Sequence, residues 1–289
     1  MQAPAPLLDA YFERIGYGGP VAPTLAVLQA IAAHHIEAIP FENLDVLLGR
    51  PIELTQEGLV AKLLRGRRGG YCFEQNGLLL GVLEAIGFTA RPLSARVRYQ
   101  QPREAILPRT HLFLRVDLNG AAWLVDVGFG GFSVGTAIRL DVGDAQQTPH
   151  DVRRILAEAG RRFHQMQMGD GWHDLNEFTG EEMPFIDRQV ANWYTSTHPA
   201  SSFRHRLVAA RGLPGGCRVT LLNRELTRRR PDGGAEVTPI ASPESLLEVL
   251  ATEFGLHFPA GTRFPCSGLD WSAGDEERGR RTEDGGRRR

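Results

Sequence analysis

The chain has 289 residues, a formal net charge of −1, 42% hydrophobic residues and 23% charged residues. This length is too great for one compact core, so we expect two or three packed units of ordinary composition. The near-zero net charge removes any global electrostatic case for binding nucleic acid or a membrane surface. The longest apolar run, residues 77–86, contains Glu84 and is far shorter than the ~20 residues that span a bilayer.

The cysteine and histidine patterns argue against a structural metal or a disulfide framework. Cys72, Cys217 and Cys266 are widely spaced and odd in number, and no His-Glu-x-x-His motif is present. We therefore expect no metal. The N-terminal segment lacks a basic region and contains Asp9 and Glu13 early, so it does not resemble a signal peptide. These features together favour a reducing, cytoplasmic location.

Residues 1–88 are expected to form a helical unit. Apolar residues at helical spacing predict helices over residues 7–15 and 24–38, and a turn is expected at residues 40–44. Thr55 is a good N-cap for a helix that runs to about residue 64. Another apolar helix is predicted from Cys72 to Gly87, because glycine commonly follows a helix C-terminus.

Cys72 is the first candidate for chemistry. It follows the paired glycines Gly69 and Gly70 and lies in the first turn of its predicted helix. Free N–H groups and the positive end of the helix dipole stabilise a thiolate at such a position. A nucleophile and a buried structural cysteine are both compatible with this stretch alone.

Residues 89–200 change from helical to alternating patterns. Strands are predicted over residues 92–99, 111–117 and 122–127, and Asn119-Gly120 between the last two is the strongest short hairpin signal. Several further short strands are expected from residue 138 to about residue 194. This segment is therefore predicted to be a small antiparallel barrel or sheet.

Residues 201–274 mix strands with one helix. Strands are expected at residues 221–226 and 236–238, on either side of a turn at residues 231–234. Ser242 and Pro243 begin a helix that Gly255 ends. Residues 275–289 contain only Asp, Glu, Arg, Gly and Thr, so they have no apolar side chain to bury and are expected to be disordered.

The hairpin brings His111 and Asp126 together. If Asn119 and Gly120 are its two central residues, both side chains lie on one face with Cβ atoms about 7–8 Å apart or less. A three-residue loop would place them on opposite faces. Gly128 would face His111 and leave open space above the pair.

A histidine, an acid and a helix-start cysteine together suggest nucleophilic catalysis. Taken singly, His111 reads as a core histidine and Asp126 as a strand-end capping residue. Combined with Cys72 they form a candidate Cys-His-Asp triad. In such a triad the imidazole takes the thiol proton, and the carboxylate fixes the tautomer of the imidazole and supports its positive charge.

Four motifs in this order resemble the arylamine N-acetyltransferases, and a further one follows near the end. They are Pro-Phe-Glu-Asn-Leu at 40–44, Arg-Gly-Gly-Tyr-Cys at 68–72, Thr-His at 110–111, Val-Asp-Val-Gly-Phe-Gly at 125–130, and the late segment 192–199. The resemblance extends to about residue 270. It implies a multi-domain α+β fold with a cysteine-protease or transglutaminase-like catalytic core. The implied units are an N-terminal helical bundle with Cys72 (1–88), a central antiparallel β-barrel with His111 and Asp126 (89–200), and a C-terminal α/β lid (201–274).

The resemblance also implies an acetyl-CoA-dependent ping-pong reaction. Cys72 takes acetyl as a thioester, and an arylamine, arylhydrazine or N-arylhydroxylamine then accepts it. Acetyl-CoA is a co-substrate, no permanently bound cofactor is expected, and the protein is expected to be a monomer or homodimer.

The resemblance assigns roles to further residues around this triad. Glu42 and Arg68 would brace the cysteine loop as a buried ion pair whose net contribution to stability is open. Phe129 would line the acceptor pocket, and Tyr71 would shape it. The residues expected near CoA are Thr110, Gly128, Gly130 and Gly131. A Gly-Phe-Gly-Gly segment can present N–H groups to anions, although a plain turn would have the same sequence.

Two other functions remain open at this stage. A transglutaminase-like or papain-like cysteine hydrolase would have the same helix-start cysteine and the same order of residues. A binding module would keep the fold without a reactive thiol. Gain of one acetyl group from acetyl-CoA would distinguish the transferase from the hydrolase. The dependence of iodoacetamide alkylation on pH would distinguish an enzyme from a binding module.

Overall fold

The computed structural model describes residues 4–169 and 171–271. Its first part is helical, as predicted, with Thr24 and Thr55 capping the two helices that they precede. Gly87 ends the last helix in a left-handed conformation (φ +102°). The helices are α1 (Pro4–Ile15), α2 (Leu25–Ala38), α3 (Leu44–Leu47), α4 (Gln56–Leu59), which continues as a π-helix (Val60–Arg65), and α5 (Cys72–Ile86). The predicted tail 275–289 lies outside the described residues.

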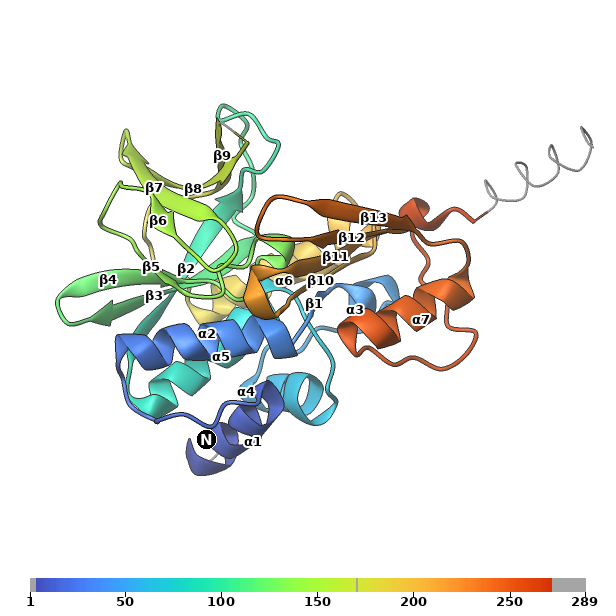
Figure 1. The fold of residues 1–289 in the computed structure, drawn as a ribbon, viewed down its shortest axis with the longest axis horizontal. Helices are drawn as coiled ribbons and strands as arrows, with labels where there is room; N and C mark the ends of the chain where they lie inside the picture. The colour runs from blue at the N-terminus through green and yellow to red at the C-terminus, as the bar shows by residue number, and fades with distance from the viewer. Residues whose placement is uncertain (1–3, 170, 272–289) are drawn as a thin grey trace, which may run out of the picture.

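An eight-stranded antiparallel sheet follows and curls into a nearly closed barrel above α2 and α5 (Figure 1). Its spatial order is β5-β4-β3-β2-β9-β8-β7-β6. The strands are β2 (Thr89–Val97), β3 (His111–Leu118), β4 (Ala121–Val125), β5 (Ala137–Arg139), β6 (Gln146–Gln147), β7 (Val152–Glu158), β8 (Arg161–Met168) and β9 (Gly171–Phe178).

The β3–β4 hairpin has the register that its turn sequence predicts. Leu118 pairs with Ala121 and Leu114 pairs with Val125, so only residues 119 and 120 form the loop. Asn119 and Gly120 both have positive φ, as a two-residue turn matched to the twist of the strands requires. His111 and Asp126 therefore lie on the same face.

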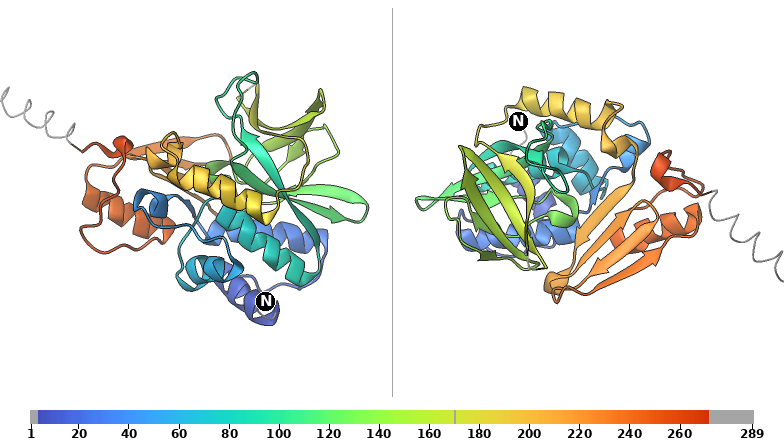
Figure 2. Two further views of the ribbon diagram at one scale, coloured as in Figure 1. Left: turned by 180° about the vertical axis from the view of Figure 1, so that it is seen from behind. Right: turned by 90° about the horizontal axis from the view of Figure 1, so that it is seen from above.

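The segment after β9 differs from the prediction, because residues 185–197 form a helix, α6 (Phe185–Thr197), and the strands expected up to residue 194 are wrong there. Most of its large hydrophobic residues do not lie on its buried face. Ile186, Val190 and Trp193 are largely exposed, whereas polar Asn192 and Thr195 are buried. Figure 2 shows α6, in yellow, reaching from the barrel toward the C-terminal part.

A second antiparallel sheet carries the C-terminal helix on one face. Its order is β1-β10-β11-β12-β13, and β1 comes from the segment expected to be only a turn. Asn223 has positive φ and begins a two-residue turn, so the single strand predicted at 221–226 is wrong. The elements are β1 (Phe41–Glu42), β10 (Val208–Gly212), β11 (Arg218–Leu222), β12 (Glu225–Arg229), β13 (Ala235–Pro239) and α7 (Pro243–Phe254).

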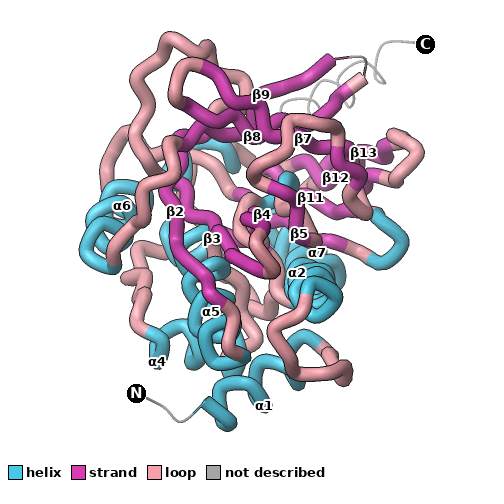
Figure 3. Tube along the Cα trace, turned by 90° about the vertical axis from the view of Figure 1, so that its left-hand side faces the viewer, coloured by secondary structure: helices cyan, strands magenta, loops and turns pink. Residues whose placement is uncertain are grey.

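Separate hydrophobic clusters hold the parts together. One cluster packs α1, α2 and α5 against Leu114 and Val116 of β3, and another packs Leu250 of α7 against Val219 of β11. Figure 3 shows the helices α1, α4 and α5 below the strands β2 and β3. The α+β fold is thus confirmed, whereas the domain boundaries at residues 88 and 200 stay predictions.

Candidate active site

Cys72 is the first residue of α5, and close packing places it there. A Cβ on Gly69 would lie 2.1 Å from the carbonyl oxygen of Pro40, and one on Gly70 would lie 2.7 Å from the Glu74 carboxyl group. That carboxylate accepts a hydrogen bond from the Tyr71 backbone N–H at 3.0 Å, which closes the first turn of the helix. The paired glycines are therefore needed for close approach of the chain on both sides of the cysteine.

His111 and Asp126 make the contact that the hairpin register predicts. Their Nε2 and Oδ2 atoms lie 2.7 Å apart, with both side chains almost fully buried. The Cys72 thiol hydrogen-bonds the His111 side chain and also donates to the Thr110 carbonyl oxygen at 3.6 Å. The sulfur, the imidazole and the carboxylate thus form one connected group.

The electrostatics of this group favour a charged imidazole. Burial by itself lowers the pKa of His111, but the Asp126 carboxylate outweighs it and raises the pKa from 6.5 to about 10. Burial by itself raises the pKa of Asp126, but His111 and further hydrogen bonds hold the pKa below its ordinary value. The buried pair is therefore an imidazolium and a carboxylate at neutral pH.

Asn76, which the sequence analysis did not single out, supports Asp126. Its Nδ2 donates to Asp126 Oδ1 at 3.0 Å and to the Leu112 carbonyl at 2.7 Å, and its Oδ1 accepts from the Val127 N–H at 3.2 Å. Asn76 lies one helical turn after Cys72 on α5, so both face β3 and the end of β4. That four-residue spacing is the only signal in the sequence that points to it.

Gly128 does not leave the open space that was expected above the pair. A Cβ there would lie 2.7 Å from the Cys72 Cα and 2.7 Å from Asn76 Nδ2. Its N–H donates to Asp126 Oδ1 at 3.1 Å. The glycine therefore lets the chain after β4 pack directly against the start of α5.

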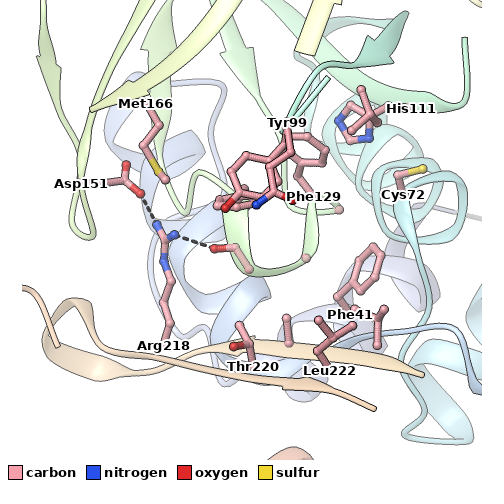
Figure 4. A pocket seen from close by; sticks show the side chains of 18 of the residues that line it. Phe41, Cys72, Tyr99, His111, Phe129, Asp151, Met166, Arg218, Thr220 and Leu222 are labelled. Atoms are coloured by element: carbon pink, nitrogen blue, oxygen red, sulfur yellow. Dashed lines mark hydrogen bonds and ion pairs between the residues drawn. The ribbon is translucent and has the colours of Figure 1, made fainter. Parts of the chain in front are cut away.

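A cavity of about 1430 Å³ opens in front of the sulfur, between the barrel and the C-terminal sheet (Figure 4). The Phe129 ring lies over His111, with centroids 4.3 Å apart. The four residues expected near CoA also line the cavity, namely Thr110, Gly128, Gly130 and Gly131. The predicted site residues on its wall are Cys72, Thr110, His111, Gly128, Phe129, Gly130 and Gly131.

Tyr71 was expected to shape the acceptor pocket, and it lies behind the cavity wall rather than on it. Its ring is fully buried, it is absent from the cavity wall, and its hydroxyl donates to Asn192 Oδ1 of α6. Its ring packs edge-on against Phe203, which does line the cavity. Tyr71 therefore supports the wall from behind.

Glu42 and Arg68 form the predicted ion pair at 2.6 Å, within a larger network that was not predicted. Arg68 also contacts Asp45 at 3.1 Å. Lys62, the only lysine of the chain, bridges Asp45 at 2.8 Å and Glu74 at 2.6 Å. Because Glu74 caps the first turn of α5, the network connects these charges to the start of the cysteine helix.

Within the described ranges, no group of three or more His, Cys, Asp or Glu side chains has the geometry to hold a metal ion. Across those same residues, no helix is long and apolar enough to cross a membrane.

Comparisons with known proteins agree with this fold. A family model described as N-acetyltransferase matches residues 24–262. The arylamine N-acetyltransferase of Mycobacterium tuberculosis (strain ATCC 25618 / H37Rv) is 42% identical over 254 residues, covering 86% of this chain and 89% of that protein. That of Escherichia coli (strain K12) is 39% identical over 251 residues, covering 87% and 89%.

Solved structures are similar over the same extent. The arylamine N-acetyltransferase from Salmonella typhimurium has a TM-score of 0.84 at 38% identity and covers 90% of this chain and 95% of its own. The Mycobacterium marinum arylamine N-acetyltransferase in complex with CoA has a TM-score of 0.82 at 38% identity, covering 86% and 92%. The fold and these relatives define an acyltransferase. The chain belongs to the arylamine N-acetyltransferase family.

Proposed function

We propose that this protein transfers acetyl from acetyl-CoA to an aromatic amine through a thioester on Cys72, by a ping-pong mechanism. The observation that carries the proposal is the placement of Cys72 on the cavity wall, hydrogen-bonded to a His111 imidazole that is itself paired with Asp126. A nucleophile, a base and an orienting carboxylate in this order are the parts that covalent acyl transfer needs.

In the first half-reaction, His111 already holds the proton of the Cys72 thiol as an imidazolium, so the sulfur reacts as a thiolate. The sulfur attacks the acetyl carbonyl carbon of acetyl-CoA, so a new S–C bond forms and the S–C bond to CoA breaks. The leaving CoA thiolate takes the proton back from the imidazolium. Asp126 supports the positive charge of His111 while it holds that proton.

In the second half-reaction, the amine nitrogen attacks the thioester carbonyl. A new N–C bond forms, the bond to Cys72 sulfur breaks, and His111 accepts the proton that the nitrogen loses. His111 keeps this proton beside the released sulfur, which restores the starting imidazolium and thiolate. We propose arylamines, arylhydrazines and N-arylhydroxylamines as acceptors, with the Phe129 ring beside the reacting centre.

The donor is proposed to lie along the turn after β4. A relative whose structure is described as a complex with CoA supports CoA as the carrier of the acetyl group. Thr110, Gly130 and Gly131 line the cavity beside Cys72, and we propose that they contact the donor. Gly128 contributes through its close packing on Cys72.

Intact mass spectrometry tests the thioester. After incubation with acetyl-CoA and removal of excess donor, the wild-type chain should gain one acetyl group and then lose it when an arylamine is added. Cys72→Ala should gain none, whereas Cys217→Ala should behave as the wild type because Cys217 does not line the cavity. A hydrolase would instead release CoA without forming N-acetylated amine, and that result would refute the transferase proposal.

A further inference from the structure

The turn that carries Phe129 is held by two arginines from two different sheets. Arg153 of β7 donates from Nη2 to the Phe132 carbonyl oxygen at 3.0 Å. Arg218 of β11 donates from Nη1 to the Gly131 carbonyl oxygen at 2.6 Å. The same short turn is thus fixed from the barrel and from the C-terminal sheet.

One carboxylate joins the two arginines. Asp151 contacts Arg153 Nε at 2.5 Å through Oδ1 and Arg218 Nη2 at 2.5 Å through Oδ2. Thr148 Oγ1 donates to Asp151 Oδ1 at 2.9 Å, which orients the carboxylate. Arg153 is fully buried, so these bonds replace its contacts with water.

The C-terminal sheet and the barrel are in close contact beside these three residues. A Cβ on Gly216 would lie 2.2 Å from the Pro149 carbonyl oxygen, and the Gly216 carbonyl lies 2.9 Å from His150 Nδ1. Figure 4 shows Arg218 and Asp151 across the cavity from Cys72 and His111, with Phe129 between them. A shift of the C-terminal sheet at this contact would therefore move the turn.

We propose that Asp151, Arg153 and Arg218 form a clamp that sets the position of the Phe129 ring over His111, and that Arg218 is thereby a positioning residue for the aromatic acceptor. This inference rests on the proposed function. The clamp touches the turn at Gly131 and Phe132, and Phe129 begins that turn.

The clamp should leave the cysteine itself unaffected. Cys72 is held by the packing of α5 and by Gly128, whereas the side-chain hydrogen bonds of Arg218 go to Gly131 and Asp151. Loss of the clamp should consequently change recognition of the acceptor more than it changes the reactivity of the thiol.

Arg218→Gln is the first test, with Arg228→Gln as the matched control. Arg228 is also in the C-terminal sheet and makes an ion pair of similar length, 2.6 Å to Glu253, but it does not contact the turn. Arg218→Gln should raise the acceptor KM about tenfold and leave iodoacetamide alkylation of Cys72 within about twofold of wild type. Arg228→Gln should change neither. Equal effects of the two variants, or lost alkylation in Arg218→Gln, would overturn the proposal.

A double-mutant cycle then separates positioning from general stability. If Arg218 acts through Phe129, adding Arg218→Gln to Phe129→Ala should lower kcat/KM no further, and the coupling should be at least about threefold. Additive losses would refute the clamp. If Arg218→Gln does not fold, Arg218→Lys replaces it as the test. Lysine keeps the positive charge beside Asp151 but lacks the planar guanidinium that also reaches Gly131. It should raise the acceptor KM in a stably folded protein, and an unchanged KM would count against the clamp.

These experiments distinguish failure of the proposed function from failure of the clamp. If acetyl-CoA does not acetylate Cys72 of the wild-type chain, the thioester mechanism is wrong whatever the arginine variants do. If the wild type is acetylated and the arginine variants match it in acceptor KM, only the clamp is wrong.

Discussion

Asp126 Oδ2 lies 2.7 Å from His111 Nε2, and this contact leaves Nδ1 as the ring nitrogen available to Cys72. The carboxylate accepts two further hydrogen bonds, from Asn76 at 3.0 Å and from the Gly128 N–H at 3.1 Å. A buried carboxylate with three donors is held in one orientation, and it holds the imidazole in one orientation as well.

Asp126→Asn should fold and lose most of its activity. The amide is neutral, so it cannot stabilise the imidazolium, and its NH₂ group favours the wrong tautomer of His111. In serine triads the same change lowers kcat about 10⁴-fold. We expect a loss of up to that size in steady-state acetyl transfer, with a circular dichroism spectrum like that of the wild type.

Asp117→Asn is the control for this change. Asp117 is on the same hairpin but is partly exposed, and it pairs with Arg115 at 2.7 Å on the surface. Pairs of this kind contribute about 0–1 kcal/mol, so activity should stay near that of the wild type. An active Asp126→Asn beside an inactive Asp117→Asn would refute the role assigned to Asp126.

The stability contributed by His111 should fall as pH rises. Its folded-state pKa of about 10 lies above the unfolded value of 6.5, so the folded state binds the proton more tightly. The contribution is complete below pH 6.5 and is lost as the pH rises through about 10. Urea unfolding of the wild type and of His111→Gln, compared across this window in reducing buffer, should show a shrinking difference in free energy. A difference that grows with pH would contradict the sign of the shift.

Arg68→Met should strongly destabilise the chain. It removes the partner of the buried Glu42 carboxylate at 2.6 Å and a contact of the guanidinium with the Phe258 ring at 4.8 Å. Breaking a buried pair on one side costs about 3–5 kcal/mol, because it leaves an unpaired charge. Urea unfolding should show this loss, and the double variant Arg68→Met with Glu42→Gln should lose less than the sum of the single variants.

The exposed pair between Arg263 and Glu244 serves as its control. These groups are 2.7 Å apart, but both side chains are more than half exposed. Arg263→Gln should therefore change the free energy of unfolding by no more than about 1 kcal/mol. Similar losses in Arg263→Gln and Arg68→Met would show that the buried network around Glu42 contributes no more to the free energy of unfolding than an exposed ion pair does.

Gly128→Ala should damage both stability and the reactivity of the thiol. The added methyl group would lie 2.7 Å from the Cys72 Cα and from Asn76 Nδ2, so the strand end or the helix must shift. Overpacking of this kind costs about 1–3 kcal/mol. Melting temperature and the rate of Cys72 alkylation should both fall.

Gly143→Ala provides the comparison for that variant. A Cβ at Gly143 would meet only the Ile155 carbonyl oxygen, at 3.8 Å, and its φ is not in the left-handed region. This variant should therefore keep the wild-type melting temperature and alkylation rate. Normal alkylation in Gly128→Ala would mean that the close packing does not position the sulfur.

Local patterns in the sequence were sufficient to predict the arrangement of much of the site. Asn119 and Gly120 adopt positive φ and set the pairing of β3 with β4, which brings His111 and Asp126 to one face. Gly87 and Gly255 end their helices in left-handed conformations, as their positions predict. These features depend on interactions between residues a few positions apart, so the sequence alone determines them.

Other features depend on which distant segments meet. The side of α6 that is buried carries Asn192, because that amide accepts a hydrogen bond from Tyr71, and hydrophobic periodicity cannot indicate this. Asp151 and Arg218 are far apart in the chain and become partners only when the barrel and the C-terminal sheet meet at the turn. A buried charged group must have a hydrogen-bonding or ionic partner, because removing an unpaired charge from water costs free energy. The tertiary structure therefore decided the supports of the site, whereas the sequence determined its cysteine, its histidine and its carboxylate.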